Sequence, residues 1–403
     1  MKIAGIAIGV CLLAVAAIPF VGYLYNHGMI QSKLLDNLLL ADKSRMEMRE
    51  AKADNRSRAV KVGIAGPLEI MRSDTLFLQG IELAVNEING GGGVLGMKLE
   101  TVIEDDRQSL TESLRIAQEF AVDIQVVAVI GHWTAAHTMP VAAFYDGLGV
   151  LLITPTVTNP ALTQNGYKTV FRNTVSDITI GKKMAAYAKN TGYKNIAIYY
   201  ADSIGGKDLT LAFETEAKKQ GVRIIDRHGV FLTKDEFDSA FKGWRTLDVD
   251  AVFVADTMRS SRNLVGWVRQ EDGDLPILAG NGFDRGNLIE YYGIDSRNIA
   301  FAGFPSVLDD GKTAGVFETA FRAKYGVKPD YFALKGYESI GIIRHALETA
   351  GSTSPSKLVN ALKSGKGFDG VDGTVSFAEN GDAKSGTVIV RKVIDGKYAT
   401  VSR

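Results

Sequence analysis

Residues 126–160 constrain the fold more than any other stretch, because two short apolar runs flank a segment of helical periodicity. The runs at 126–130 and 150–154 consist almost entirely of Val, Ile, Leu and Ala, which is typical of strands buried on both faces. Parallel strands need a crossover connection, and the apolar spacing between the runs predicts a crossover helix. The stretch therefore predicts a βαβ unit of a parallel sheet.

Small and polar residues follow both predicted strands. Thr134, Ala135 and Ala136 come after the first strand. Thr156 and Thr158 come after the second. The carboxyl ends of parallel strands lie on one edge of the sheet, and ligands of open α/β sheets bind outside that edge. We therefore expect hydroxyl groups and free backbone amides to gather where a small molecule is held.

The same alternation of strand and helix continues through most of the chain. Further strands are expected at residues 60–65, 98–103, 195–200, 223–230, 251–254, 276–278 and 299–302. Helices are expected between them, the first at 73–89, and then at 315–325, 331–350 and 354–363. This order predicts an α/β fold with doubly wound parallel sheets. The end of the chain differs, because Asp395-Gly396 between two alternating runs predicts a β-hairpin.

Composition excludes several classes of protein. The 403 residues, of which 46% are hydrophobic, are enough for two or three domains. The 46 basic and 46 acidic side chains cancel, which argues against nucleic acid as a partner. Cys11 is the only cysteine, so neither a disulfide nor a thiolate metal site can form within one chain.

No motif points to catalysis. Residues 91–96 match G-x-G-x-x-G, but a predicted helix precedes them and a strand follows, the reverse of a dinucleotide-binding loop. His132 is interpreted as structural, and residues 104–106, Glu-Asp-Asp, as solvated carboxylates at a strand end. Because no nucleophile and base can be assembled, we expect no catalytic residues, no metal and no cofactor, and the protein is not expected to be an enzyme.

The N-terminus carries an apolar segment. Residues 3–25 contain no charged side chain over 23 positions, which exceeds the apolar core of a signal peptide and suffices for a spanning helix. Residues 1–28 are therefore predicted to be a transmembrane anchor, with a cleaved signal as the alternative. Lys2 places the short end inside and the bulk of the chain outside. Residues 29–58 are predicted to be a helical stalk rather than a coiled coil, because the heptads are too few.

The order of these features resembles the extracytoplasmic solute-binding proteins of ABC importers, of the leucine/isoleucine/valine-binding type (type I periplasmic binding proteins). The resemblance covers residues 60–403. The segments that carry it are Gly66-Pro67, Gly92-Gly93-Val94-Leu95-Gly96, Asp105-Asp106, Gly131-His132, Thr154-Pro155, Thr158-Asn159-Pro160, Phe171-Arg172-Asn173 and Gly336-Tyr337.

The resemblance implies two doubly wound lobes with a ligand cleft between them, joined by three chain crossings. We place the crossings near Val175, Gly303 and Gly370. The binding domain is then residues 59–403. Lobe 1 is about 59–175 and 304–370, and lobe 2 is about 176–303 and 371–403.

The resemblance also implies contact residues, some of which depart from the family pattern. The turn containing Thr134, Ala135 and Ala136 and the turn containing Thr156 and Thr158 correspond to the grip on the ligand carboxylate. A family serine aligns with Ala135. In the second lobe, the family acid that pairs with the ligand ammonium aligns with Asn281, and tyrosines align with Gly205 and Thr257. Asp256 and Asp284 are alternative acids.

The implied function is an extracytoplasmic receptor, the substrate-binding component of a branched-chain-amino-acid-type ABC importer. It would close two lobes on a small polar solute (an amino acid, an amide or a small carboxylate) and deliver it to ABC permease subunits. The alternative is a membrane-tethered sensory domain that passes ligand occupancy to a signalling partner chain. In either case we expect a periplasmic location, tethered to the inner membrane by the N-terminal helix. The departures at Ala135, Gly205 and Asn281 favour a larger or less polar ligand than an α-amino acid.

Overall fold

The structure is a computed structural model that describes residues 46–53, 59–304, 315–371, 373–384 and 386–402. The predicted anchor, residues 1–28, lies outside the described residues, as does the predicted stalk up to residue 45. Within the described ranges, no helix is long and apolar enough to cross a membrane.

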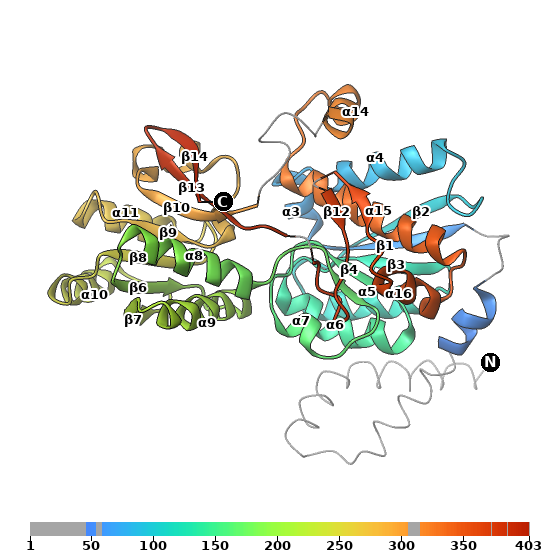
Figure 1. Ribbon diagram of the computed structural model, residues 1–403, viewed down its shortest axis with the longest axis horizontal. Coiled ribbons are helices and arrows are strands. Elements are labelled where there is room, and N and C mark those ends of the chain that lie inside the picture. Colours follow the sequence, from blue (N-terminus) through green and yellow to red (C-terminus); the bar gives the residue numbers. More distant parts are fainter. Residues whose placement is uncertain (1–45, 54–58, 305–314, 372, 385, 403) are drawn as a thin grey trace, which may run out of the picture. The chain divides into compact units, whose positions relative to one another are not determined.

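The chain divides into two compact units (Figure 1). The first contains the described residues up to Thr156, with Leu162–Asn173 and Thr313–Lys384. The second contains Val157–Ala161, Thr174–Lys312 and Ser385–Arg403. Each unit is therefore assembled from segments that are distant in the sequence.

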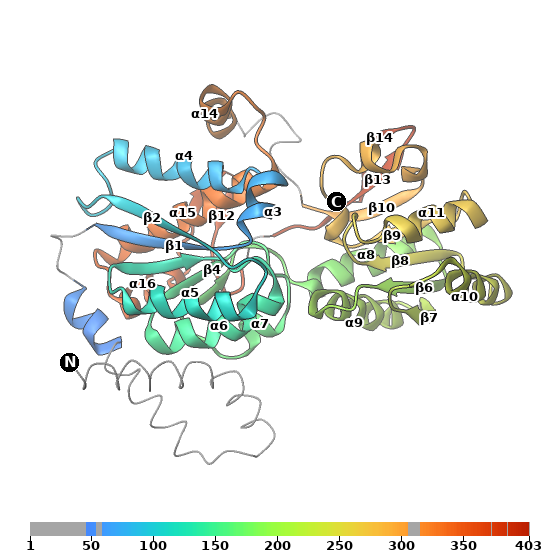
Figure 2. The same cartoon turned by 180° about the vertical axis from the view of Figure 1, so that it is seen from behind.

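The first unit is built around a five-stranded parallel sheet with the order β2-β1-β3-β4-β5. Helices α4 and α15 cover one face of this sheet, and α5 and α6 cover the other (Figure 2). Its strands are β1 Val60–Gly66, β2 Leu99–Asp105, β3 Val126–Ile130, β4 Leu151–Thr154 and β5 Val170–Arg172. Its helices and small hairpin are α3 Leu68–Ser73, α4 Phe77–Gly90, α5 Leu110–Val122, α6 Ala135–Leu148, α7 Ala161–Gln164, α14 Gly315–Tyr325, α15 Tyr331–Ala350, α16 Pro355–Lys363, β11 Phe368–Gly370 and β12 Gly373–Val375.

The core of this unit follows from the apolar strands. Every residue of β3 is buried, as expected for a central parallel strand that is covered on both faces. Ile130 lies in register with Ile64 of β1 and with Ile153 of β4. The three side chains belong to one cluster with Ile340 and Ile343 of α15, so the strands and this late helix share a core.

Helices α4 and α15 approach each other through glycine. A Cβ on Gly80 would lie 1.9 Å from the Ala333 carbonyl oxygen, and a Cβ on Gly336 would lie 2.3 Å from the Phe77 carbonyl oxygen. Both distances are well below van der Waals contact, so any larger residue would push the helices apart. The two glycines therefore set the spacing of the helix pair.

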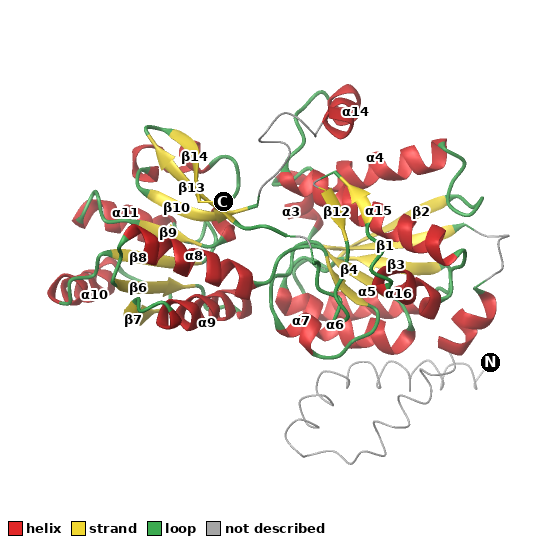
Figure 3. Cartoon of the chain, viewed as in Figure 1, coloured by secondary structure: helices red, strands yellow, loops and turns green. Residues whose placement is uncertain are grey.

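The second unit is built around a seven-stranded sheet with the order β14-β13-β10-β9-β8-β6-β7. The five strands from β10 to β7 are parallel, and β13 and β14 are antiparallel. Figure 3 shows the strands in yellow with helices packed on them. The strands are β6 Asn195–Tyr200, β7 Arg223–His228, β8 Ala251–Ala255, β9 Ile277–Ala279, β10 Ile299–Gly303, β13 Ile389–Ile394 and β14 Lys397–Ser402. The helices are α8 Asp177–Thr191, α9 Ile204–Lys219, α10 Lys234–Thr246, α11 Arg262–Glu271, η1 Asn281–Phe283, α12 Leu288–Tyr292 and η2 Gly293–Ser296.

The expected C-terminal hairpin is confirmed. β13 and β14 are joined by Asp395 and Gly396, whose φ angles are 49° and 69°. Both values are positive, as the favoured two-residue hairpin turns require.

The predicted start of one helix was wrong. The sequence predicted a single helix over residues 73–89, whereas α3 ends at Ser73 and α4 begins at Phe77. The break is held by a distant residue, because Asp330 Oδ2 accepts a hydrogen bond from the Leu76 N–H at 3.0 Å. The hydrophobic periodicity of residues 73–89 does not indicate the contact with Asp330.

The third chain crossing also differs from the expectation. The sequence assigned residues 371–403 to the second lobe, whereas the chain up to Lys384 packs with the first unit. The Phe377 ring meets the Phe171 ring edge-on, with centroids 5.1 Å apart. Asp382 forms a salt bridge with Arg172 at the end of β5. Because of these contacts, the chain leaves the first unit after Lys384 and not near Gly370, as predicted.

The chain before β1 docks on the amino edge of the first sheet. Residues 46–52 are helical, and the Arg49 side chain within them is buried. Its guanidinium donates to the Ala121 and Asp123 carbonyls at the end of α5, at 2.8 and 3.2 Å, and to the Val126 carbonyl at 2.7 Å. Arg49 therefore satisfies carbonyl groups that a helix leaves without partners at its C-terminus.

A second contact fixes the same helix. The Glu50 carboxylate accepts hydrogen bonds from the Ser354 hydroxyl and, at 2.9 Å, from the Ser356 N–H at the start of α16. The Ala53 carbonyl accepts from the Thr353 hydroxyl at 2.5 Å. Part of the predicted stalk is thus packed against the first unit.

We expect Arg49→Met to lower the stability of the first unit, because it removes charge-assisted hydrogen bonds from buried carbonyls. The free energy of unfolding should fall by about 2–3 kcal/mol. Lys52→Met, at an exposed position of the same helix, is the matched control and should change little. Denaturant unfolding of both variants checks this, and equal midpoints would show that the docked helix does not stabilise the unit.

Candidate ligand-binding site

Two turns at the carboxyl edge of the first sheet lie side by side. They follow β3 and β4, which are neighbouring parallel strands with Ile130 opposite Ile153. The Thr156 hydroxyl donates to the Trp133 carbonyl at 2.8 Å. This bond ties the second turn to the first, so the structure brings Thr156 next to the segment that leads into Thr134.

The first turn ends in the N-terminus of α6. Thr134 occupies the N-cap position, but its hydroxyl contacts His137 Nδ1 at 2.8 Å and does not cap the helix. The N–H groups in the first turn of a helix have no acceptor within the helix, and the helix dipole makes this end favourable for anions. Ala135 is half-buried and Ala136 is exposed. Their amides are suited to hold a carboxylate.

Thr158 belongs to the other unit. Residues 157–161 pack with the second unit, and the Thr158 carbonyl accepts from the Asp177 N–H at the start of α8 at 2.8 Å. The neighbouring Asn159 side chain donates to Asp208 of α9. The structure therefore assigns Thr158 and Thr156 to different units, although only Val157 lies between them.

The three remaining predicted residues follow parallel strands of the second sheet. Gly205 lies in the first turn of α9 after β6, Thr257 follows β8, and Asn281 follows β9. These strands are neighbours in the order β9-β8-β6. The turns after β8 and β9 are joined by a hydrogen bond from the Met258 N–H to the Gly282 carbonyl at 3.2 Å. The second unit thus gathers these three residues along one edge.

The structure distinguishes between the two alternative acids. Asp284 pairs with Arg391 at 3.1 Å and accepts from the Phe304 N–H at 3.0 Å. Asp256 accepts from the Thr257 N–H through one oxygen at 2.6 Å. Its other oxygen is buried without a hydrogen-bond partner among the described residues. Burial raises the pKa of the Asp256 carboxyl.

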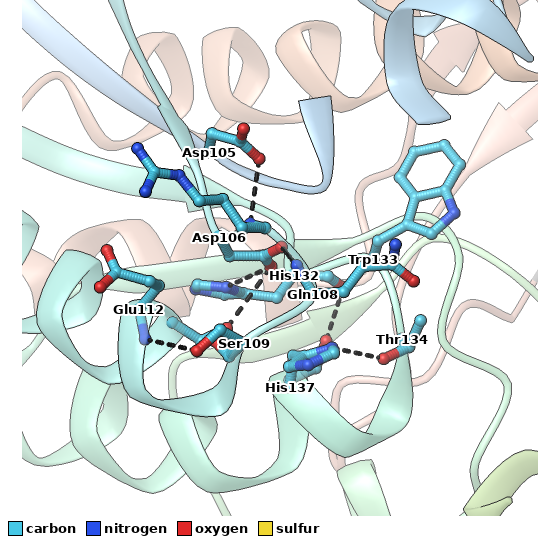
Figure 4. A network of polar contacts seen from close by, with 12 residues as sticks. Asp105, Asp106, Gln108, Ser109, Glu112, His132, Trp133, Thr134 and His137 are labelled. Carbon is cyan, nitrogen blue, oxygen red and sulfur yellow. Dashed lines mark hydrogen bonds and ion pairs between the residues drawn. The ribbon is translucent and has the colours of Figure 1, made fainter. Parts of the chain in front are cut away.

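A buried polar network supports the first turn (Figure 4). His132 is fully buried directly before the turn, with Nε2 3.3 Å from the Tyr145 hydroxyl and Nδ1 3.5 Å from Asp106 Oδ2. The His132 carbonyl accepts from the Thr138 hydroxyl at 2.5 Å. Gln108 donates its N–H to Asp106 at 3.0 Å. The network therefore joins the ends of β2 and β3 to α6.

The interpretation of Asp106 as a solvated carboxylate was wrong, because its side chain has no exposed surface. Burial alone would raise its pKa, but the contact with His132 and the Gln108 N–H hold the pKa of Asp106 below its ordinary value. Burial lowers the pKa of His132 despite the nearby carboxylate. No signal within residues 104–106 indicates the pairing, because His132 follows a different strand.

Together these features define a protein class. Two α/β units each present polar and glycine-containing turns at the carboxyl edge of a parallel sheet, which is where open α/β sheets hold small ligands. Residues 60–397 match the family of periplasmic binding proteins. The chain belongs to this family, and its fold is the type I periplasmic binding fold. It is an extracytoplasmic solute-binding protein and not an enzyme, as predicted.

Three similar proteins illustrate the relationship. The leucine-, isoleucine-, valine-, threonine- and alanine-binding protein of Pseudomonas aeruginosa is 25% identical over 329 residues, covering 81% of this chain and 87% of the relative. An ABC transporter substrate-binding protein from Desulfitobacterium hafniense, solved in complex with Leu, has a TM-score of 0.76 and 32% identity, covering 85% of this chain and 100% of that one. The branched-chain amino acid transporter substrate binding protein LivJ from Streptococcus pneumoniae, solved with isoleucine, has a TM-score of 0.72 and 25% identity, covering 86% and 100%.

We expect acid to destabilise the protein through His132. The folded protein keeps this ring neutral, because burial lowers its pKa below the value of about 6.5 for an exposed imidazole. Its contribution to stability is therefore present above that pH. It is lost as pH falls, because the unfolded chain takes up a proton that the folded protein does not, at up to about 1.4 kcal/mol per pH unit.

The measurement is denaturant unfolding between about pH 7.5 and 5.5, compared with His132→Gln. The substitution should lower stability at neutral pH and make the pH dependence shallower. An unchanged slope in His132→Gln would refute the assignment.

Proposed function

We propose that the protein is the substrate-binding component of a branched-chain-amino-acid-type ABC importer. It captures a small polar solute by hinge closure of its two lobes and delivers it to permease subunits. The observation that carries the proposal is the pair of joined turns after β3 and β4, with the uncapped start of α6 between them. Family membership and the transport-related names of similar proteins support an importer over a sensory role.

The carboxylate of the solute is proposed to lie against the first turn. The amides of Ala135 and Ala136 supply N–H donors, and the hydroxyl of Thr158 supplies a further hydrogen bond. Trp133 packs against Phe77 and Phe332, with ring centroids 5.4 Å apart in both cases. This aromatic packing holds the backbone of the turn, so the donors are positioned before the ligand arrives.

The rest of the ligand is proposed to meet the second unit at Gly205, Thr257 and Asn281. An unpaired ammonium is costly to bury, and the Asn281 amide carries no charge to balance one. An amide or a carboxylate without an amine therefore suits Asn281, which both donates and accepts. Gly205 leaves room for a larger group. Within the described part of the chain, Asp256 Oδ2 is buried without a hydrogen-bond partner, so an amine-bearing ligand would use this carboxylate instead.

The chain is also proposed to be tethered to the inner membrane through residues 1–28, with the protein body in the periplasm. The basis is the uncharged stretch over residues 3–25. Fractionation of cells that express the full chain tests the tether. Release of the protein in a soluble, N-terminally shortened form would show a cleaved signal instead.

The ligand class is best tested by a thermal-shift screen followed by calorimetry. The compounds are leucine and isoleucine, the amides of both, and the matching carboxylates without the amine. A ligand that binds only the folded state raises the unfolding temperature by mass action. Stabilisation by amides or carboxylates but not by leucine is expected, and tight binding of leucine would contradict the argument from Ala135 and Asn281.

We expect Thr158→Val to weaken binding of the ligand that the screen identifies. The change keeps the side-chain volume and removes the hydroxyl, and a lost hydrogen bond to a charged group costs about 1.5–3 kcal/mol, roughly one to two decades in affinity. Thr246→Val on the exposed end of α10 is the matched control. Unchanged affinity in Thr158→Val would contradict the placement of the site.

We expect Ala135→Ser to strengthen carboxylate binding, because it adds a hydroxyl donor at the start of α6. It should not confer leucine binding by itself, since Asn281 supplies no charge. The double variant Ala135→Ser with Asn281→Glu should bind leucine measurably by calorimetry. If neither variant differs from the unmodified protein, these positions do not determine the ligand.

A further inference from the structure

Three half-buried aromatic side chains lie beside the turn after β3. Trp133 belongs to this turn, and Tyr331 and Phe332 begin α15. The Trp133 ring is tilted by 31° against the Phe332 ring, with centroids 5.4 Å apart. The Phe332 ring in turn meets the Tyr331 ring edge-on, with centroids 5.7 Å apart. The three rings therefore form one continuous surface of the first unit, which we call the aromatic wall.

The aromatic wall lies at the same edge of the first sheet as the proposed carboxylate donors. Gly66 ends β1, which is next to β3 in the sheet, and a Cβ on Gly66 would lie 3.6 Å from Trp133 Cβ. The indole points away from the buried network around His132 (Figure 4). The Ala135 and Ala136 amides follow in the same turn. A small ligand whose carboxylate binds these amides can place its remaining atoms against the wall.

The Trp133 ring is held in position by the core of the first unit. Phe77, which is 1% exposed, meets the indole edge-on at an interplanar angle of 84°, with centroids 5.4 Å apart. The Trp133 carbonyl accepts from the Thr156 hydroxyl at 2.8 Å. The side chain is thus fixed on its inner side while part of its surface stays exposed. Little ordering is needed when such a surface binds a ligand.

The aromatic character of the wall distinguishes between two kinds of apolar ligand group. Burial of apolar area does not favour a flat ring, because a saturated ring of the same size buries at least as much apolar surface. Pairs of aromatic rings in offset or edge-on geometry are stabilised beyond the contribution of burial. A rigid surface made of three such rings therefore selects a flat aromatic group.

We propose that the aromatic wall binds an aromatic ring of the ligand, so that the solute is a carboxylate that carries an aromatic ring and no amine. The inference rests on the proposed binding of a carboxylate at the start of α6, and it names the chemical class of the solute. Trp133 is then a residue that determines specificity in addition to its contact with Phe77.

The test is calorimetry of the full chain in detergent with phenylacetate and cyclohexylacetate. The two compounds share the carboxylate and the ring size, and only the first ring is flat and aromatic. Phenylacetate should bind about threefold to tenfold more tightly, and Trp133→Leu should abolish this preference. The matched control is Trp267→Leu, which removes a half-buried indole of the second unit that packs on Phe237 with centroids 5.7 Å apart, and it should keep the preference.

A second measurement keeps the test decisive if Trp133→Leu folds poorly. The chain has 3 tryptophans, and the other two, Trp244 and Trp267, lie in α10 and α11 of the second unit. Phenylacetate should therefore change the tryptophan fluorescence of the unmodified protein. Trp133→Phe keeps an aromatic ring, so it should still bind phenylacetate but lose this change. A fluorescence change that persists in Trp133→Phe would overturn the placement of the ring.

Equal affinities for the two compounds in the unmodified protein, or a preference that survives Trp133→Leu, would also overturn the role of the aromatic wall. If neither compound binds but an amide or an aliphatic carboxylate does, the aromatic inference fails and the proposed function stands. If none of these compounds binds, the carboxylate at the start of α6 fails together with the inference.

Discussion

Parallel strands that are covered on both faces leave few positions at which polar side chains can be accommodated. In β3 and β8 every side chain is buried, so neither strand can present a hydroxyl, an amide or a charge along its length. Polar groups must therefore gather where the strands end. The candidate contacts in both units follow from this constraint, and the turns that carry them have to be held in place by bonds from outside the strands.

Buried polar and charged groups hold the first sheet at three of its borders. Arg49 binds carbonyl groups at the amino edge, Asp106 and His132 fix the carboxyl edge, and Arg172 joins β5 to a returning segment at the side. Such groups are costly to bury and contribute little unless every partner is present. Each of them links segments that are remote in the sequence, so their main effect is to fix the backbone geometry of those segments.

The strands, most helices and the final hairpin could be predicted because their signals are local. Apolar runs such as residues 126–130 and the pair Asp395-Gly396 specify structure within a few positions. The break before α4 and the true end of the first unit could not be predicted, because Asp330 and Asp382 act on segments far from themselves.

The candidate site shows the same limit. The two turns of the first sheet were evident from neighbouring strands. The assignment of Thr158 to the second unit was not evident, because it depends on the contact with Asp177 at the start of α8. The sequence alone does not show whether Asp256 or Asp284 is already paired with a cation. Only the contact of Asp284 with Arg391 shows which carboxylate is already paired.

The glycine contact between α4 and α15 has a consequence for the order of folding. α15 begins at Tyr331, so it leaves the ribosome only after residues 174–304, the main body of the second unit, have been made. Until then Val62, Ile64 and Phe77, which share a core with α15, lack the part of their cover that this helix supplies. The five parallel strands of the second unit are already made while the first unit still exposes apolar surface. The residues that are synthesised first therefore wait for a late helix to complete their core, and the exposed apolar surface favours aggregation during this interval.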